Sequence, residues 1–471
     1  MSKLLKQFDG LVKYAIASLL MAIPLYPKFP AIRIPGTYVS VRLEDFLIIV
    51  VTLIALIRFL PEIKRILNNN VPLNNNVPLK KDIERSILIL LGIGAISLLS
   101  AIFVTQTVVP HLGVLHLLRR IEYFIPFFIG IMYFRDKKED VLEFFLKVLM
   151  IVLVVALVYG VGQKYFSWPV IVTQNEEYSK GIALRWIPGS HINSTFAGHY
   201  DLATFLVLLL PIFVSLFFVV KKITSKVLLL VVIFSGLWLL ANAVSRISIV
   251  SYLLGVTLAL ILIKRIKAIP IVILVSLIIF SFSSDLLARY TRIIEVTYKK
   301  ILSTTEINIS PSFIYAQETD IQKKRATIPT PTPEPVFEDR STSIRLNVEW
   351  PRAIRAFKKN PLLGTGYSSI TLATDNDFLR LLGEVGLLGF LAFWLLFGRI
   401  FHTFTKIFPV TKYFSGVSLA FVGGMTGALP GVFLNAFFID VFEASKFATI
   451  FWLLMGITVA MARKKINEKT I

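Results

Sequence analysis

Residues 148–159 read VLMIVLVVALVY, a stretch without a single charged side chain. A strand of a membrane β-barrel alternates apolar and polar residues, and this stretch does not alternate. The apolar character continues over residues 144–162, close to the roughly 20 residues that an α-helix needs to cross a hydrocarbon layer about 30 Å thick. The stretch therefore predicts a membrane-spanning helix.

The rest of the chain contains further apolar runs of this kind, about twelve in all with residues 144–162. They cover approximately residues 11–25, 43–60, 86–104, 121–134, 200–220, 227–243, 247–263, 268–287, 382–400, 415–433 and 446–462. The count is defined to within one, because residues 121–134 are short and residues 415–433 are rich in glycine. The sequence predicts an all-α polytopic membrane protein. Its parts are a membrane domain at 1–283 with spans 1–9, a long exported loop at 284–377, and a second membrane domain at 378–471 with spans 10–12.

The composition agrees with a lipid environment, since 55% of the residues are hydrophobic, 17% are charged and the mean hydropathy is +0.74. The net charge of +21 would suggest nucleic acid in a soluble protein. In a membrane protein it is explained by basic cytoplasmic loops and contact with anionic membrane lipids, so no nucleic-acid partner is expected. The absence of cysteine excludes a disulfide scaffold, a thiolate metal site and a cysteine nucleophile.

Lysine and arginine in the short loops predict the orientation, because cytoplasmic loops carry an excess of them. With a cytoplasmic N-terminus, the cytoplasmic side carries Lys3, Lys6, Lys64, Arg65, Lys80, Lys81, Arg135, Lys137, Lys138, Lys221, Lys222, Lys226, Lys264, Arg265, Lys267, Arg463, Lys464 and Lys465. Both termini are thus predicted on the cytoplasmic side of the plasma membrane. The first span resembles a signal peptide, but no small-x-small cleavage site follows it, so we expect it to be retained.

This orientation can be tested with single cysteines, because the chain has none of its own. Asn69→Cys should be shielded from an impermeant thiol reagent in intact cells, whereas Ala326→Cys should be labelled. The reverse pattern would overturn the orientation and, with it, the site proposed below.

Two hydrophilic segments interrupt the apolar runs. Residues 68–79 contain NNNVPL twice, which is typical of a turn-rich connector. The loop at 284–377 has a basic, helix-prone stretch at 289–303, then IPTPTPEP at 328–335, which cannot continue a helix, and then a second helix-prone segment at 341–359. A loop of this length usually forms a lid or a site.

The segment at 341–359 places several arginines on one side of the predicted helix. Arg345, Arg352 and Arg355 recur at nearly helical spacing, while Trp350 can pack on another side. Pro361, Gly364 and Gly366 then predict a tight turn. Guanidinium groups bind phosphate oxygens bidentately, so the row suits a phosphate-bearing substrate. The alternative is a basic interfacial helix that lies on lipid head groups.

The same region resembles the O-antigen ligase and polymerase superfamily of integral membrane glycosyltransferases. The matching positions are Arg345, Trp350, Pro361, Gly364, Gly366, Asp375, Asn376, Leu379 and Glu384-Val385-Gly386. Upstream, Ser194-Thr195-Phe196, Asp201-Leu202-Ala203, Pro211 and Ser245-Arg246 resemble two further family segments. The resemblance covers roughly residues 190–400 and is carried by the order of these short motifs.

The resemblance implies that the donor is a glycan joined through a diphosphate to a polyprenyl lipid. Arg246 and Arg345 would stabilise the departing diphosphate without a metal or other cofactor, and Asp375 would be the base. Family ligases most often have histidine at that position, whereas an acidic residue is commoner among polymerases. His199 is the alternative base. The isolated Asp375-x-Asp377 pair is the one acidic motif that a metal could use, and we expect no metal there.

Further candidates for substrate binding come from the exported side. They are Arg119, Arg120, Arg185, Trp350, Arg352, Asn376 and His199. Arg119 and Arg120 precede the predicted span at 121–134, and interfacial anchoring is the alternative role for them. Arg185 lies in the loop after the fifth span, where it could contact sugar.

The leading hypothesis is therefore a metal-independent, inverting polymerase of polyprenyl-diphosphate-linked oligosaccharides. A ligase that moves the glycan to a lipid or protein acceptor is the nearest alternative, and a transporter of the lipid-linked glycan is the second. A transporter often has charges at mid-depth in broken helices, whereas here the charges gather at the exported interface. The sugar, the linkage, the acceptor and the oligomeric state cannot be predicted from the sequence.

Overall fold

The computed structural model describes residues 2–27, 29–32, 34, 40–67, 81–135, 137, 139–172, 182–283, 291, 343–371 and 373–470. The NNNVPL repeat, the basic stretch at 289–303 except residue 291, and the proline-rich segment at 328–335 lie outside the described residues, as do Asn69 and Ala326.

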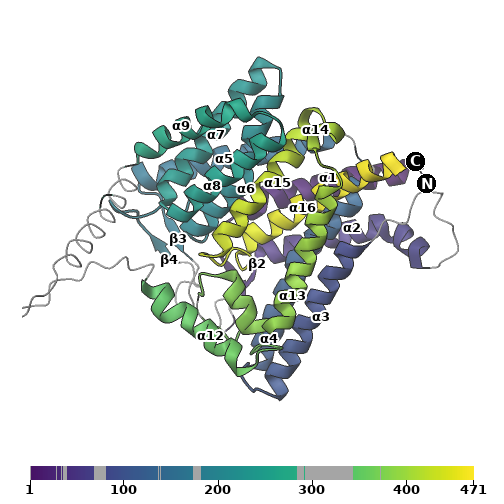
Figure 1. Ribbon diagram of the computed structural model, residues 1–471, viewed down its shortest axis with the longest axis vertical. Coiled ribbons are helices and arrows are strands. Elements are labelled where there is room, and N and C mark those ends of the chain that lie inside the picture. Colours follow the sequence, from purple (N-terminus) through teal and green to yellow (C-terminus); the bar gives the residue numbers. More distant parts are fainter. Residues whose placement is uncertain are drawn as a thin grey trace, which may run out of the picture.

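Helices make up most of the described chain (Figure 1). They are α1 (Ser2–Leu25), α2 (Leu43–Leu67), α3 (Asp82–Phe103), α4 (Pro110–Phe134), α5 (Glu139–Tyr165), α6 (His199–Val219), α7 (Ile223–Ala243), α8 (Arg246–Leu262), η2 (Ile266–Ala268), α9 (Ile269–Ser281), η3 (Arg345–Glu349), α12 (Trp350–Lys359), α13 (Asp377–Thr405), α14 (Val410–Tyr413), α15 (Gly416–Ala436) and α16 (Ser445–Thr470).

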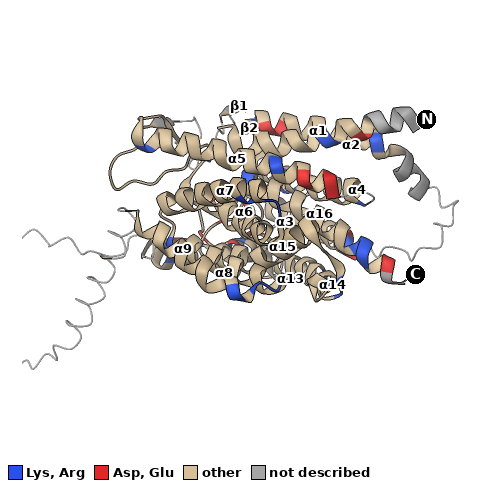
Figure 2. Cartoon of the chain, turned by 90° about the horizontal axis from the view of Figure 1, so that it is seen from above, with Lys and Arg blue, Asp and Glu red and all other residues tan. Residues whose placement is uncertain are grey.

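Every predicted apolar run coincides with one of these helices, although α9 ends at Ser281, before the end of the run at 268–287. Within the described residues, eight helices are long and apolar enough to cross a membrane. Figure 2 shows that most of the helical surface carries neither acidic nor basic residues. The protein is thus an all-α polytopic membrane protein, and the number of crossings and the length of the exported loop stay predictions.

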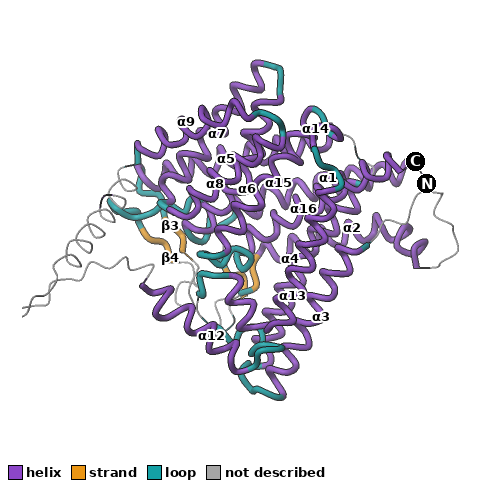
Figure 3. Tube along the Cα trace, viewed as in Figure 1, coloured by secondary structure: helices purple, strands orange, loops and turns teal. Residues whose placement is uncertain are grey.

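Two small antiparallel sheets depart from the all-helical expectation (Figure 3). One pairs β1 (Pro30–Ile32) with β2 (Val41–Arg42), and the other pairs β3 (Val170–Val172) with β4 (Ile182–Leu184). Strands of two or three residues are too short to produce a period-2 pattern that sequence analysis could detect.

The centre of the bundle is built around α15, which packs against α6 and α8, while α16 packs against α4 (Figure 1). Glycine permits this close approach, because a Cβ at Gly424 would lie 2.5 Å from the Cα of Ile212 in α6. Small residues at such contacts let membrane helices meet backbone to backbone. The glycine-rich run is therefore a true helix with a packing role.

The two ends of the bundle carry different elements. The start of α1 and the end of α16 lie at one end in both views (Figures 1 and 2). At the other end lie α12, β3 and β4 (Figure 1). α12, β3 and β4 belong to segments predicted to be exported, and they lie away from the two termini (Figure 1). The number of crossings and the side of the membrane stay predictions.

Candidate functional site

The site begins with the helical segment at 343–359, which was predicted over residues 341–359. Its first part, η3, is a π-helix, a geometry that often occurs at functional sites. α12 continues it and packs against α13. Arg345, Glu349 and Arg352 are partly buried, whereas Leu346 and Arg355 are exposed. The arginines of the predicted row therefore differ in burial: Arg345 and Arg352 are partly buried, and Arg355 is exposed.

Arg345 binds Asp375, which lies in the turn before α13. Both Nε and Nη2 of Arg345 donate to Oδ2 of Asp375, at 3.0 and 2.7 Å. Nη2 also donates to the hydroxyl of Tyr200, at 3.4 Å, in the first turn of α6. The side chains of Arg345 and Asp375 are only 11% and 21% exposed, so water screens the pair weakly. Two residues predicted as catalytic thus meet directly.

Asp440, in the connection between α15 and α16, holds the turn that carries Asp375. Its carboxylate accepts the backbone N–H groups of Thr374 and Asn376, at 2.8 and 3.1 Å, and Nη1 of Arg380, at 2.9 Å. Asp375 itself has a φ of +49°, a left-handed conformation that aspartate tolerates better than most residues. Asp440 therefore fixes the backbone on both sides of the proposed base.

Asn376 caps α13. Its side-chain oxygen accepts the N–H of Leu379, at 2.9 Å, as an N-cap asparagine does. The residue is buried. Its use in substrate binding stays a proposal, and the cap is what the structure shows.

Burial and charge act in opposite directions on the Arg345–Asp375 pair. Burial raises the pKa of the Asp375 carboxyl, Arg345 lowers it and Asp440 raises it, and the pKa is raised overall. Burial would lower the pKa of Arg345, but Asp375 and Tyr200 raise it above its ordinary value. Arg345 therefore stays charged, while Asp375 is a stronger base than an exposed aspartate.

Four buried polar atoms around this pair have no hydrogen-bond partner among the described residues. They are Oε2 of Glu349, Nε1 of Trp350, Nη1 of Arg352 and Oγ1 of Thr374. The Trp350 ring faces Phe438, with ring centroids 6.4 Å apart. Buried polar groups are nearly always satisfied, so a cluster of donors and acceptors without partners is typical of a site that binds a polar ligand.

The predicted turn at Pro361, Gly364 and Gly366 docks on a break in α13. Gly386 has a φ of +75°, which interrupts the helix after Glu384. The turn supplies the missing partners, because Leu387 N donates to Pro361 O at 2.8 Å and Gly366 N donates to Glu384 O at 2.8 Å. A Cβ at Gly364 would lie 2.5 Å from the carbonyl carbon of Glu384. The turn with Gly364 and Gly366 therefore packs closely against the backbone of α13 at the Gly386 break.

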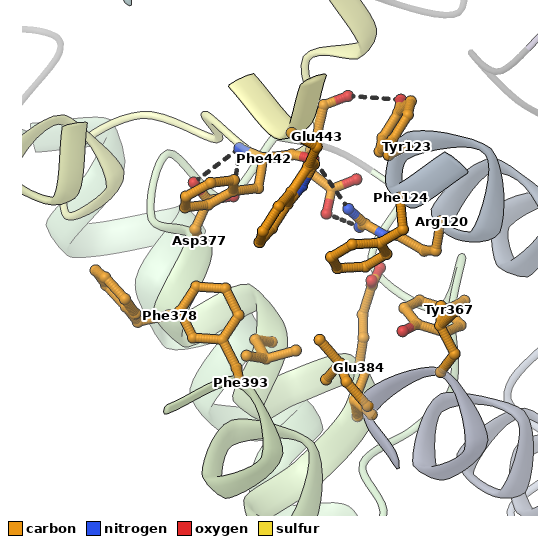
Figure 4. A pocket seen from close by; sticks show the side chains of 15 residues that line it. Arg120, Tyr123, Phe124, Tyr367, Asp377, Phe378, Glu384, Phe393, Phe442 and Glu443 are labelled. Atoms are coloured by element: carbon orange, nitrogen blue, oxygen red, sulfur yellow. Dashed lines mark hydrogen bonds and ion pairs between the residues drawn. The ribbon is translucent and has the colours of Figure 1, made fainter. Parts of the chain in front are cut away.

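Arg120 lines a cavity between α4, α13 and the α15–α16 connection (Figure 4). It forms an ion pair with Glu443 and lies over the Tyr367 ring, 5.5 Å from the centroid. The Glu384 side chain extends into the same space. The cavity has about 70 Å³ of free space. Arg120 thus lies beside two carboxylate residues in a cavity whose other lining residues are mostly apolar or aromatic.

Arg119 binds two acidic residues, one from α2 and one from α4 itself. Its Nη1 donates to Asp45 at 2.5 Å and to Glu122 at 2.8 Å, and its Nη2 donates to Asp45 at 2.9 Å. These contacts favour an architectural role for Arg119 over substrate binding.

Arg119 and Arg120 were predicted to precede the span at 121–134. Both lie within α4, which begins at Pro110, so the helix extends before the predicted span. Where the span itself begins stays a prediction.

His199 and Arg246 are the first residues of α6 and α8. The His199 ring stacks on His191 and contacts Tyr200, with centroid distances of 4.0 Å to each. Arg246 is the partly buried first residue of α8, which packs beside α6. α6 and α8 begin at the same end of the bundle, so Tyr200 and Arg246 both lie at that end. Arg185 is exposed in the loop after β4.

Glu349, Asp440 and Arg380 were not predicted to belong to the site. Glu349 could have been found, because it lies four residues after Arg345 and three before Arg352, and such spacings share a helix face. Asp440 and Arg380 carried no local signal, since their partners come from other elements.

No curated protein matches the chain. Residues 229–394 match the O-antigen ligase family model, and this range runs from within α7 to within α13, so it includes Arg246, Arg345 and Asp375. Over this region, which carries the candidate site, the chain is therefore similar to O-antigen ligases, and the match supports the O-antigen ligase-related superfamily.

Proposed function

We propose that the protein polymerises polyprenyl-diphosphate-linked oligosaccharide units at the outer face of the plasma membrane, in the synthesis of a surface polysaccharide. The observation that carries the proposal is the Arg345–Asp375 pair, at 2.7 Å, inside the region that matches the family. Buried polar atoms of nearby residues in the chain have no partner among the described residues, which supports it. The exported loop at 284–377 lies between the two membrane domains in this proposal.

The arginines bind the donor. A guanidinium has five N–H donors, so Arg345 can hold Asp375 and a phosphate oxygen together. Arg352, whose Nη1 lacks a partner among the described residues, and Arg246 at the start of α8 supply further positive charge. Such groups stabilise the charge that develops on a departing diphosphate, so the proposed transfer uses no metal.

Asp375 takes the proton of the acceptor hydroxyl. The hydroxyl oxygen bonds to the anomeric carbon of the donor sugar, the bond from that carbon to the diphosphate breaks, and the diphosphate leaves with the electron pair. Attack from the side opposite the leaving group inverts the anomeric centre. Trp350 offers an aromatic surface for a sugar ring, and His199, Arg185, Arg120 and Asn376 are the remaining candidates for contact with the glycans.

A ligase is the second candidate, because it uses the same donor and differs only in the acceptor. Asp375 stands where family ligases most often have histidine, which favours the polymerase. A transporter would not need a base beside the arginines.

The products of the purified protein distinguish these functions. In lipid nanodiscs with a polyprenyl-diphosphate oligosaccharide as the only substrate, we expect longer lipid-linked glycans, resolved by mass spectrometry. Transfer only after a separate lipid or protein acceptor is added would identify a ligase. Consumption of no donor under either condition would contradict both enzyme functions.

A further inference from the structure

Glu349 occupies the middle of the arginine face of η3 and α12. It lies one turn after Arg345 and one turn before Arg352, and both arginines act on it electrostatically. Two carboxylates from other elements also act on it, Asp375 from the turn before α13 and Asp440 from the α15–α16 connection. Glu349 is thus within electrostatic range of two cations and two anions.

The three carboxylates differ in their hydrogen bonds. Asp375 accepts two from Arg345, and Asp440 accepts from Arg380 and two backbone N–H groups. Oε2 of Glu349 is buried and accepts none from the described residues. An ionised Glu349 would therefore place a poorly stabilised negative charge beside the arginines that the anionic donor needs.

The ionisation of Glu349 is correspondingly unfavourable. Burial raises the pKa of Glu349 most, Asp375 and Asp440 raise it as well, and Arg345 and Arg352 lower it, so that the pKa is about 7. Near neutral pH the free protein thus contains both the acid and the carboxylate form of this residue.

We propose that Glu349 binds the donor as a neutral acid, taking up a proton from solvent when the diphosphate arrives and donating a hydrogen bond to a phosphate oxygen. The proposal rests on the function proposed above and adds to it that donor binding is coupled to protonation. Glu349 belongs to the donor site, whereas Asp375 acts on the acceptor.

The direction of the pH effect follows from the charges. Both phosphates of a lipid diphosphate sugar are esterified and stay ionised from pH 6 to 9, so the donor does not titrate. Its negative charge raises the pKa of Glu349 further in the complex. Affinity should therefore be constant well below about pH 7 and then fall, by up to about tenfold per pH unit, until the pKa of the complex is reached.

The affinity of the purified full-length protein in nanodiscs for farnesyl-diphospho-N-acetylglucosamine, measured from pH 6 to 9, tests this. The wild type should lose affinity above about pH 7. Glu349→Gln should bind nearly as well at pH 6 and lose little up to pH 9, because glutamine keeps a hydrogen-bond donor and carries no charge. Glu143→Gln, on α5 with a side chain 46% exposed, is the matched control and should titrate as the wild type does.

Two outcomes would overturn the role of Glu349 alone. In the first, the affinity of Glu349→Gln for the donor depends on pH as that of the wild type does. In the second, the loss of affinity above about pH 7 disappears in Asp375→Asn but persists in Glu349→Gln. If the wild type does not bind farnesyl-diphospho-N-acetylglucosamine at any pH, the proposed function itself is contradicted. Wild-type binding that is independent of pH would leave that function standing and remove the coupling.

Discussion

Replacing Arg345 by lysine should lower the rate of glycan transfer at least about tenfold, which corresponds to about 1.4 kcal/mol of transition-state stabilisation. The charge is kept, but lysine cannot reproduce the planar fork whose Nε and Nη2 both reach Asp375, at 3.0 and 2.7 Å. The contact to Tyr200 would also be lost. The measurement is the initial rate of chain elongation, with protein abundance and the thermal unfolding midpoint recorded for each variant.

Arg246→Lys should have a similar effect if Arg246 holds the other part of the diphosphate. Arg265→Lys is a suitable control, because Arg265 is exposed just beyond the opposite end of α8. A helix that merely lies on lipid head groups would work about as well with lysine. Near-normal rates in both Arg345→Lys and Arg246→Lys would thus contradict the diphosphate clamp.

Asp375→Asn should abolish transfer while leaving the folded protein in place. Asparagine matches aspartate in size and tolerates the left-handed backbone, φ +49°, that this position requires. Its amide cannot accept the proton of the acceptor hydroxyl. In the wild type, kcat should fall as the pH drops through the raised pKa of Asp375, since protonation removes the base.

Asp375→His should restore part of the activity, because imidazole is a base near neutral pH and histidine is also frequent among left-handed residues. It would weaken the attachment of Arg345, so full activity is not expected. If Asp375→Asn still elongates glycan at nearly the wild-type rate, Asp375 is not the base. His199, which contacts Tyr200 beside Arg345, would then be tested by His199→Gln.

The order of the site motifs could be read from the sequence, and the family resemblance that they carry singled out Arg345 and Asp375 as candidate catalytic groups. Arg345 and Asp375 lie in short segments with a recognisable pattern of charged residues, glycine and proline. Their 2.7 Å contact could not be derived, because it depends on how α12 packs against α13 and on the turn before α13.

The supporting residues show what sequence alone could not provide. Tyr200 is 145 positions from Arg345, and Asp440 is 66 and 64 positions from the backbone groups of Thr374 and Asn376 that it binds. Arg119 similarly finds Asp45 74 positions away. None of these pairs shares a helix face or a turn, so no local periodicity links them.

The sequence by itself determined that the chain is a bundle of membrane helices. Lipid favours long apolar runs, and every backbone N–H and C=O group within such a run must find a hydrogen-bond partner close by. A helix provides these partners within the segment. That requirement acts on each segment separately, so it can be read along the chain. Only the tertiary structure decided which charges are paired inside the protein, as in Arg119 with Asp45. It also decided which buried polar atoms of the site have no partner among the described residues. The physical reason is that the energy of a buried charge or hydrogen bond depends on what surrounds it in space.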